Sequence, residues 1–340
     1  MRTLPQHQYV QRHSGAVVTE NLFSDRLVNL VYSRGREIAP HLFRQLTSRR
    51  SNDLWAYLNY DLTAGNPRRA ARRVIRRLGI DLNECVDAAS LRSPRRVFER
   101  QIRYWACRPM AAAEDQVVSP ADARMIFGSL ARQSLLFLKE KFFGLEELLG
   151  FDKPVWRRAF EAGPFAIFRL TPEKYHYNHL PVSGIVRDIY SIDGAFHSCN
   201  PGAVVRMVQP YSKNRRVVTI VDTDVADGSG VGLVAMIEIV ALMIGDIVQC
   251  YSPRRYETPR PLTPGGFARR GQPKSLYRPG SSVDVLLFQK GRIRFCDDLK
   301  RNLRHPGARS RFSEGFGRRL VETDVAVRST IAHKEYRHAG

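Results

Sequence analysis

The sequence has few cysteines, and they do not form a recognisable framework. Its five cysteines stand at positions 85, 107, 199, 250 and 296 of the 340 residues, and no two have the spacing Cys-x-x-Cys. An odd number of cysteines without paired spacing argues against a disulfide scaffold and a zinc ribbon, and it favours a reducing compartment. The chain must therefore fold around a hydrophobic core, for which 43% hydrophobic residues are available.

Long apolar runs and acidic residues are also scarce. Residues 231–250 are the most apolar span, but Glu238 and Asp246 interrupt it, so it lacks the roughly 20 apolar residues of a membrane helix. Residues 1–8 are polar and lack the apolar segment of a secretory signal, so any membrane association is expected to be peripheral. Lys and Arg number 54 against 33 Asp and Glu. The resulting charge of +21 predicts an anionic partner, either lipid or nucleic acid.

The pattern along the chain predicts an α+β fold with three parts. Residues 1–20 are expected to form a mobile arm. Residues 21–110 are basic and carry apolar residues at helical spacing, which predicts a helical, membrane-docking region. Residues 111–340 carry short runs of Val, Ile and Phe bounded by Gly and Pro, which predicts a β-rich domain, a barrel or a sandwich.

The residue pattern also predicts individual helices, a strand and a loop. Helices are predicted at 21–31, 54–62, 93–109 and 131–150, a half-buried strand at 321–328, and a loop in the Arg-rich stretch 301–319. No internal repeat and no low-complexity tract is present.

One predicted helix separates arginines from apolar residues. It starts at Gly65-Asn66-Pro67, and its apolar residues alternate in pairs with Arg68, Arg69, Arg72, Arg73, Arg76 and Arg77. Such a helix is able to lie on an anionic bilayer, with arginines toward the headgroups. An ordinary surface helix with its apolar side on the core is the alternative. Nucleic-acid binding is disfavoured because zinc-finger, RNA-binding and basic-zipper patterns are missing.

The Gly280-Ser281-Ser282 triplet precedes an apolar segment and has chemistry of its own. Glycine leaves its carbonyl unshielded, so a following serine hydroxyl is able to attack it and convert the peptide to an ester. Elimination then frees a chain ending at Gly280 and leaves dehydroalanine, which hydrolyses to a pyruvoyl group, a ketone that condenses with a substrate amine. A plain hairpin turn is the alternative for the triplet alone.

Two other stretches offer an acid and two bases. Ser119-Pro120-Ala121-Asp122 places a carboxylate after a turn, and residues 174–184 carry His176 and His179. With Ser281 they make up the residue types of a nucleophile–base–acid triad, if the fold brings them together. No further Cys or His cluster lies nearby in the sequence, so no metal site is expected.

The order of these stretches and their residues resemble the motifs of the phosphatidylserine decarboxylase family, from about Phe98 to Phe288. Phe98-x-Arg100, Arg108-Pro109 and Ser119-Pro120-Ala121-Asp122 are similar to its first motifs. The stretch Tyr175-His176-Tyr177-Asn178-His179-x-Pro181-x-x-Gly184 resembles its most specific one. Further stretches that match in order are 143–150, Asn200-Pro201, 234–238 and 280–288.

The resemblance implies conversion of phosphatidylserine to phosphatidylethanolamine and CO2 through a Schiff base on a pyruvoyl group made from Ser281. Autocleavage after Gly280 would yield a heterodimer of chains 1–280 and 281–340, and a homodimer is left open. Asp122 and His179 would activate Ser281 for cleavage, and His176 would serve decarboxylation. Neither a metal cofactor nor a nucleic-acid partner is expected. The expected location is the cytoplasmic face of the cell membrane, bound peripherally.

Some positions depart from the family pattern. No residue with a proposed chemical role departs from the pattern. The family's usual residues are replaced at five other positions, by Ala123, Glu140, Pro273, Ser275 and Pro279. The departures leave two alternatives open. One is a pyruvoyl-dependent decarboxylase of a soluble amino acid or another serine-bearing lipid, and the other is a catalytically idle protein that binds anionic lipid.

Overall fold

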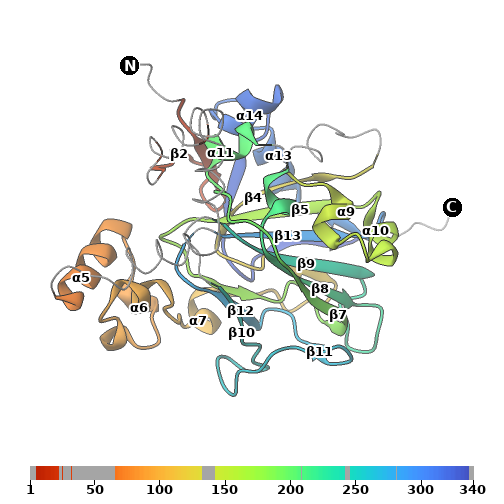
Figure 1. Ribbon diagram of the computed structural model, residues 1–340, viewed down its shortest axis with the longest axis horizontal. Coiled ribbons are helices and arrows are strands. Elements are labelled where there is room, and N and C mark those ends of the chain that lie inside the picture. Colours follow the sequence, from red (N-terminus) through yellow and green to blue (C-terminus); the bar gives the residue numbers. More distant parts are fainter. Residues whose placement is uncertain are drawn as a thin grey trace.

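A ten-stranded sheet forms the centre of the molecule (Figure 1). The computed structural model describes residues 5–22, 25, 32, 66–131, 142–207, 209–241, 246–280 and 282–336. The strand order is β11 (Phe267–Ala268), β7 (Gly184–Ile192), β8 (Arg216–Asp222), β9 (Leu233–Val240), β13 (Ser282–Phe288), β5 (Pro164–Leu170), β4 (Ala123–Ser129), β15 (Glu322–Val325), β1 (Gln8–Gln11) and β2 (Val17–Thr19). Neighbours are antiparallel except for β1 and β15, which are parallel.

Two small sheets cover one face of the large sheet, and helices cover the other. The small sheets are β10 (Ile247–Gln249), β12 (Pro273–Tyr277) and β6 (Tyr177–His179), and β14 (Ile293–Phe295), β16 (Thr330–Lys334) and β3 (Gln116–Val118). With α13 (Asp297–Leu303) they enclose one hydrophobic core. The second core lies under α9 (Leu145–Leu149), α10 (Pro154–Phe160), α11 (Pro201–Arg206), α12 (Pro210–Lys213) and α14 (Arg311–Phe316).

Strand β13 shows how the sequence specifies these layers. Val283, Val285 and Leu287 enter the core on the helix side, and Leu286 and Phe288 enter the core on the small-sheet side. Both sets are apolar because a central strand is buried on both faces. The small-sheet face also carries Ser282 and Asp284, since side chains alternate along a strand.

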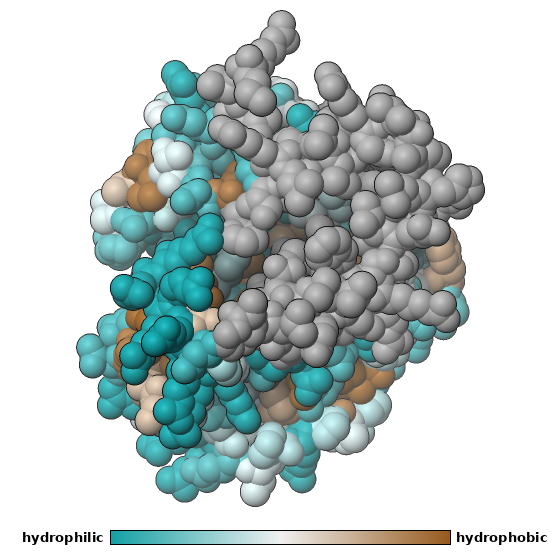
Figure 2. Space-filling view, turned by 60° about the vertical axis from the view of Figure 1, so that its left-hand side comes forward, coloured by the Kyte–Doolittle hydropathy of each residue, from teal (hydrophilic) through white to brown (hydrophobic). Residues whose placement is uncertain are grey.

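A lobe of short helices projects from one end of the sheet (Figure 1). It contains α5 (Pro67–Leu78), two 3-10 turns (Leu82–Glu84 and Ala88–Ser90), α6 (Pro94–Phe98) and α7 (Tyr104–Cys107). Asn66 caps α5 at its start, and Gly79, with φ 63°, ends it in the left-handed conformation that glycine favours. Figure 2 shows the face on which this end of the molecule comes forward, where hydrophilic side chains predominate among the described residues.

The predicted α+β class is confirmed, and the β-rich part is a sandwich of sheets rather than a closed barrel. The helix predicted after Asn66 is α5, and the strand predicted at 321–328 is β15. The predictions at 54–62, most of 21–31 and the first half of 131–150 fall outside the described residues, while 145–149 is helical. The domain boundaries at 20 and 110 stay predictions.

Three expectations were wrong. Residues 8–11 and 17–19 are strands of the large sheet rather than a mobile arm, because Tyr9 and Val10 are buried against it. The Arg-rich stretch holds α13 and α14 rather than a loop, since Leu299, Phe312 and Phe316 anchor it in the cores. Residues 93–109 form two short helices, because a β-bridge between Cys85 and Ile102 interrupts them.

None of the helices in the described part of the chain has the length and apolar character that a bilayer-spanning segment requires.

Candidate active site

The two predicted histidines lie beside the strand that leads to the Gly280-Ser281 bond. His176 precedes β6 and His179 ends it, and β6 pairs with β12, which runs toward Gly280. The register places Pro273 opposite His179 and Leu276 opposite Tyr177. The Tyr277 N–H also donates to the His176 carbonyl, at 3.0 Å. Strand pairing thus brings together residues that are a hundred positions apart in the sequence.

Gly280 has a backbone conformation suited to glycine. Its φ is 147°, which L side chains rarely adopt, and it lies between the end of β12 and the start of β13. Ser281 itself falls outside the described residues. Ser282 is fully buried at the first position of β13, between Leu170 of β5 and Val240 of β9.

His179 is a buried, neutral imidazole. Its Nδ1 lies 2.9 Å from the Gly271 carbonyl, which only accepts, so Nδ1 carries the proton. Its Nε2 then accepts from the Tyr175 hydroxyl at 3.0 Å, and that hydroxyl lies 2.7 Å from the hydroxyl of Tyr256. Burial lowers the pKa of His179 to about 3, so its neutral form is the one present near pH 7.

Asp122 is a buried carboxylate held by an arginine. It accepts two or more hydrogen bonds from Arg108, at 2.9 to 3.2 Å, and one from the Val327 N–H at 2.8 Å. Burial alone would raise the pKa of Asp122, but the Arg108 charge and hydrogen bonds outweigh it and the pKa is lowered. Among the described contacts Asp122 makes no hydrogen bond to His179, although its charge raises the pKa of that histidine. The backbone N–H of His179 donates to the Pro120 carbonyl, two residues before Asp122, at 2.7 Å.

His176 is fully buried and stacks on Phe98, with ring centroids 3.6 Å apart. Within the described residues neither ring nitrogen has a hydrogen-bond partner of normal geometry. Burial, and then the positive charge of Arg100, hold the pKa of His176 well below its usual value. His176 is therefore a neutral imidazole whose nitrogens are available to another group.

A buried polar cluster lies between the large sheet and β12, and sequence reasoning did not assign it to the site. Lys274 and Glu238, both fully buried, form an ion pair, and Ser275 also donates to Glu238. Asp284 lies opposite Glu238 in the register and accepts from the Tyr277 hydroxyl at 2.7 Å. The signal was present: Glu238 and Asp284 are single acidic residues within otherwise apolar strands.

The surroundings of Asp284 in this cluster favour its protonated form. Burial and the neighbouring charge of Glu238 raise its pKa well above its usual value. Its Oδ2 and the Ser282 Oγ, two residues earlier on the same face, are buried without a hydrogen-bond partner among the described residues. Several polar atoms near the Gly280-Ser281 bond therefore lack a hydrogen-bond partner within the described part of the chain.

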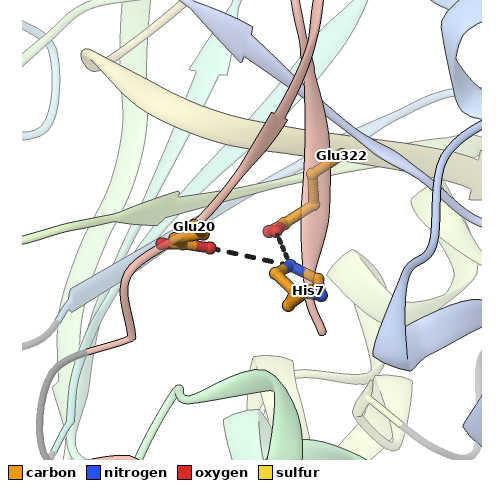
Figure 3. Close-up of side chains that lie close together, drawn as sticks. All are labelled: His7, Glu20 and Glu322. Carbon is orange, nitrogen blue, oxygen red and sulfur yellow. Dashed lines mark hydrogen bonds and ion pairs between the residues drawn. The ribbon is translucent and has the colours of Figure 1, made fainter. Parts of the chain in front are cut away.

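A second cluster, toward the edge of the large sheet that β1 and β2 form, combines His7, Glu20 and Glu322 (Figure 3). His7 Nε2 lies 2.6 Å from Glu322 and 3.7 Å from Glu20. Its residue types would suit a metal ion, but Arg169 already donates to both oxygens of Glu20 and of Glu322, at 2.6 to 3.0 Å. The arginine compensates the carboxylate charge, so the cluster acts as a structural ion-pair network that fixes β1 and β2.

The six predicted membrane-binding arginines are all exposed on α5. The apolar side of that helix is turned inward: Val74 and Ile75 pack with Ala71, Cys85 and Leu91. The apolar edge is thus used within the lobe, and the arginine face alone meets solvent.

Comparisons with known proteins match the region that contains these residues. A family model described as phosphatidylserine decarboxylase matches residues 95–318, well over half of the chain. This range includes Asp122, His176, His179 and the Gly280-Ser281 bond. The chain belongs to the phosphatidylserine decarboxylase family.

Relatives within the phosphatidylserine decarboxylase family come from distant organisms. A protein of Chlamydia trachomatis serovar L2 named phosphatidylserine decarboxylase proenzyme is 36% identical over 203 residues, which cover 59% of this chain and 61% of the relative. The proenzyme of Fusobacterium nucleatum is 26% identical over 301 residues, 87% of this chain and 91% of the relative. Proenzyme 2 of Oryza sativa is 32% identical over 228 residues, 66% of this chain and 34% of the relative. The match to the Chlamydia protein thus spans less than two thirds of that relative.

Proposed function

We propose that this chain is a proenzyme that cleaves itself between Gly280 and Ser281 and then decarboxylates phosphatidylserine to phosphatidylethanolamine and CO2. The observation that carries the proposal is the pairing of β6 with β12, which brings two neutral histidines to the strand that precedes Gly280. Membership of the family and the proenzyme names of its relatives support it.

The cleavage needs no external reagent except water. The Ser281 hydroxyl adds to the Gly280 carbonyl, its proton passes to a base, and the C–N bond breaks to leave an ester. Loss of the Ser281 α proton then expels the Gly280 carboxylate and leaves dehydroalanine, whose imine tautomer is hydrolysed with release of ammonia. A neutral imidazole is the base this sequence requires, and His179 is such a group.

Asp122 would support His179 through its charge. Once His179 takes a proton it becomes cationic, and the Asp122 carboxylate stabilises that cation because it stays ionised through its contact with Arg108. The proton would enter at Nε2, the nitrogen that now accepts from Tyr175. Tyr175 would then turn its O–H away from that nitrogen and donate to the Tyr256 hydroxyl, which donates to the Ile102 carbonyl.

The residues around position 281 fit a pyruvoyl group. Such a group presents carbonyl oxygens, and the buried Ser282 Oγ and His176 nitrogens lack partners among the described residues. When present, the group would capture the substrate amine and withdraw electrons as CO2 leaves. His176 would hold the proton that is delivered to the substrate carbon, with its ring kept in place by the stack on Phe98.

Anionic lipid is the surface on which this enzyme would work. The net charge of +21 and the exposed arginine face of α5 favour peripheral binding to the anionic cytoplasmic face of the cell membrane. Because the apolar side of α5 packs within the lobe, we expect the contact to be electrostatic rather than by insertion of that side.

The first test is the intact mass of the purified chain under denaturing conditions, beside Ser281→Ala. We expect two fragments, residues 1–280 and 281–340, the smaller one without a free α-amine and reactive toward carbonyl reagents. Ser281→Ala should stay whole and release no CO2 from phosphatidylserine. A single uncleaved mass for the unchanged chain, persisting with membranes, would refute the proposal. Cleavage with CO2 released from free amino acids alone would favour the soluble-substrate alternative.

A further inference from the structure

A pocket of about 200 Å³ opens between the helical lobe and β6 and β12. Its lining includes Arg96 from α6, Arg100 and Gln101 from the segment after that helix, and Tyr177 and Leu276 from the paired strands. Arg96 also lines a wider, more open pocket of about 560 Å³ that reaches Pro67 at the start of α5. The two pockets therefore adjoin, with Asp87, Ser90 and Arg96 in the lining of both.

Arg100 is a buried cation in this pocket, and no carboxylate of the described residues binds it. Its side chain is 7% exposed, and its hydrogen bonds go to the backbone carbonyls of Val97 and Glu173, at 3.2 and 2.7 Å. Nearby Asp122 and Glu84 act on it through space, but both bind Arg108 directly. Burial lowers the pKa of Arg100, which reflects the unfavourable desolvation of its charge. A bound anion would relieve that cost.

The acidic residues of the pocket already have partners. Asp87 accepts from the backbone N–H groups of Ala89 and Ser90, and Glu99 pairs with Arg95 at 3.4 Å. Arg96 at the mouth forms no ion pair with a described residue. The lining thus offers two cations to a ligand, one buried and one exposed.

The pocket lies next to the proposed reaction centre. Tyr177 follows His176 in the chain, and Leu276 pairs with Tyr177. Phe98, two residues before Arg100, is the ring that stacks on His176. A substrate held by Arg100 would therefore extend along Phe98 toward His176.

We propose that this pocket binds the phosphodiester of the substrate headgroup, with Arg100 as the buried cation and Arg96 at the mouth. The inference rests on the proposed function, because it assumes that a substrate amine reacts at position 281. In phosphatidylserine two carbons and an oxygen separate the amine from the phosphorus, so both ends are able to bind at neighbouring sites. Arginine suits a phosphodiester because its planar guanidinium donates to two oxygens together. A free amino acid would leave Arg100 without an anion, and the pocket would select against it.

The test compares two amines with the self-cleaved enzyme. Glycerophosphoethanolamine carries an amine and a phosphodiester, and ethanolamine carries the amine alone. Each is incubated with the protein and cyanoborohydride, and the reduced adduct on the 281–340 chain is measured by mass. We expect the unchanged protein to label at least tenfold more readily with glycerophosphoethanolamine. Arg100→Met should lose most of that preference, Arg96→Met part of it, and the distant exposed Arg294→Met none. Inorganic phosphate should compete with glycerophosphoethanolamine and leave labelling by ethanolamine unchanged.

The outcomes separate the pocket from the reaction. Absence of cleavage in the unchanged protein would overturn the proposed function. Normal cleavage with equal labelling by the two amines, or an unaltered preference in Arg100→Met, would overturn the phosphodiester pocket and leave the decarboxylase proposal intact. If Arg100→Met fails to fold or to cleave, Arg96→Met and the phosphate competition test the pocket in its place. An unchanged preference for glycerophosphoethanolamine in Arg96→Met, together with no competition by inorganic phosphate, would refute the pocket. If phosphate reduces labelling by the two amines equally, the effect is a general salt effect, and this result would count against the phosphodiester pocket.

Discussion

His176 and His179 are only three residues apart, yet their surroundings differ in a way that separates two roles. His179 has partners on both ring nitrogens, whereas the nitrogens of His176 have none of normal geometry among the described residues. A ring held at both nitrogens has a fixed tautomer, which suits a base used once for cleavage. An unpartnered ring in an apolar stack remains able to exchange a proton with substrate in every turnover.

We therefore expect His176→Ala to cleave itself but to decarboxylate phosphatidylserine on the order of 100-fold more slowly, the usual loss when a general acid is removed. Fragment masses and CO2 release measure the two steps separately. His179→Ala should fail at cleavage, and the exposed His13→Ala should behave as the unchanged protein. Normal turnover by cleaved His176→Ala would show that another group protonates the product.

Asp284 gives a prediction about pH. Its pKa is raised in the folded protein by burial and by Glu238, whereas an unfolded aspartate ionises near pH 4. Its contribution to stability is full below that pH and decreases as pH rises toward the folded pKa, because the unfolded chain then releases a proton that the folded chain keeps. Asp284→Asn removes this dependence while keeping the oxygen that accepts from Tyr277.

The Asp284→Asn variant should gain stability relative to the unchanged protein between pH 5 and 8, by at most about 1.4 kcal/mol per pH unit. Urea unfolding of the uncleaved Ser281→Ala background at both pH values measures it. The same substitution at the exposed Asp193 is the control. A constant difference across this pH range would show that Asp284 is ionised in the fold.

At the scale of elements, the sequence predicted what local pattern controls and missed what distant contacts control. The start and end of α5 were predictable because Asn66, Pro67 and Gly79 are local signals. Strand β1 was missed because four residues, two of them glutamine, carry little pattern. One of its two neighbours, β15, lies more than 300 positions away in the sequence. The motif residues of the candidate site were read from the resemblance. Arg100 and Asp284 are important because they are buried, and a local sequence pattern does not predict that burial.

Helix α5 supplies the prediction at this scale. Arg68, Arg69 and Arg72 lie in its first half, where positive charge opposes the helix dipole, so replacing them by glutamine should not weaken the helix. Each arginine near an anionic surface favours binding by about 1 kcal/mol, so the triple variant should bind anionic vesicles roughly 100-fold more weakly at low salt. Flotation with phosphatidylglycerol vesicles at several NaCl concentrations measures the change.

The matched control for α5 is Arg187→Gln with Arg254→Gln and Arg294→Gln, which removes the same charge from exposed positions elsewhere. An equal loss of vesicle binding in the two triple variants would show that net charge, rather than this helix, attracts the membrane.

At the scale of the whole molecule, cleavage after Gly280 would cut through the architecture without dividing it. The 281–340 chain contains β13, which pairs with β9 and β5 at the centre of the large sheet, and β15, which pairs with β4 and β1. Glu322 of that chain would then bind Arg169 and His7 of the larger one. Buried strands and a buried ion-pair network would join the two products, so they should remain one particle in the absence of denaturant.

Glu322 makes this association sensitive to acid. Although burial alone would raise the pKa of its carboxyl, Arg169 and His7 hold it below the usual value, so its stabilising contribution is present above about pH 4 and is lost as pH falls toward the folded pKa. Glu322→Gln leaves Arg169 with a poorer partner, and breaking a buried pair costs about 3–5 kcal/mol. The variant should therefore release its small chain at lower urea than the unchanged protein at pH 7, and the difference should shrink toward pH 3.

Size-exclusion chromatography of the cleaved protein in stepped urea measures the release, and the exposed Glu314→Gln in the same chain is the control. Equal release of the Glu322→Gln and Glu314→Gln small chains at pH 7 would mean that strand pairing alone holds the two chains together.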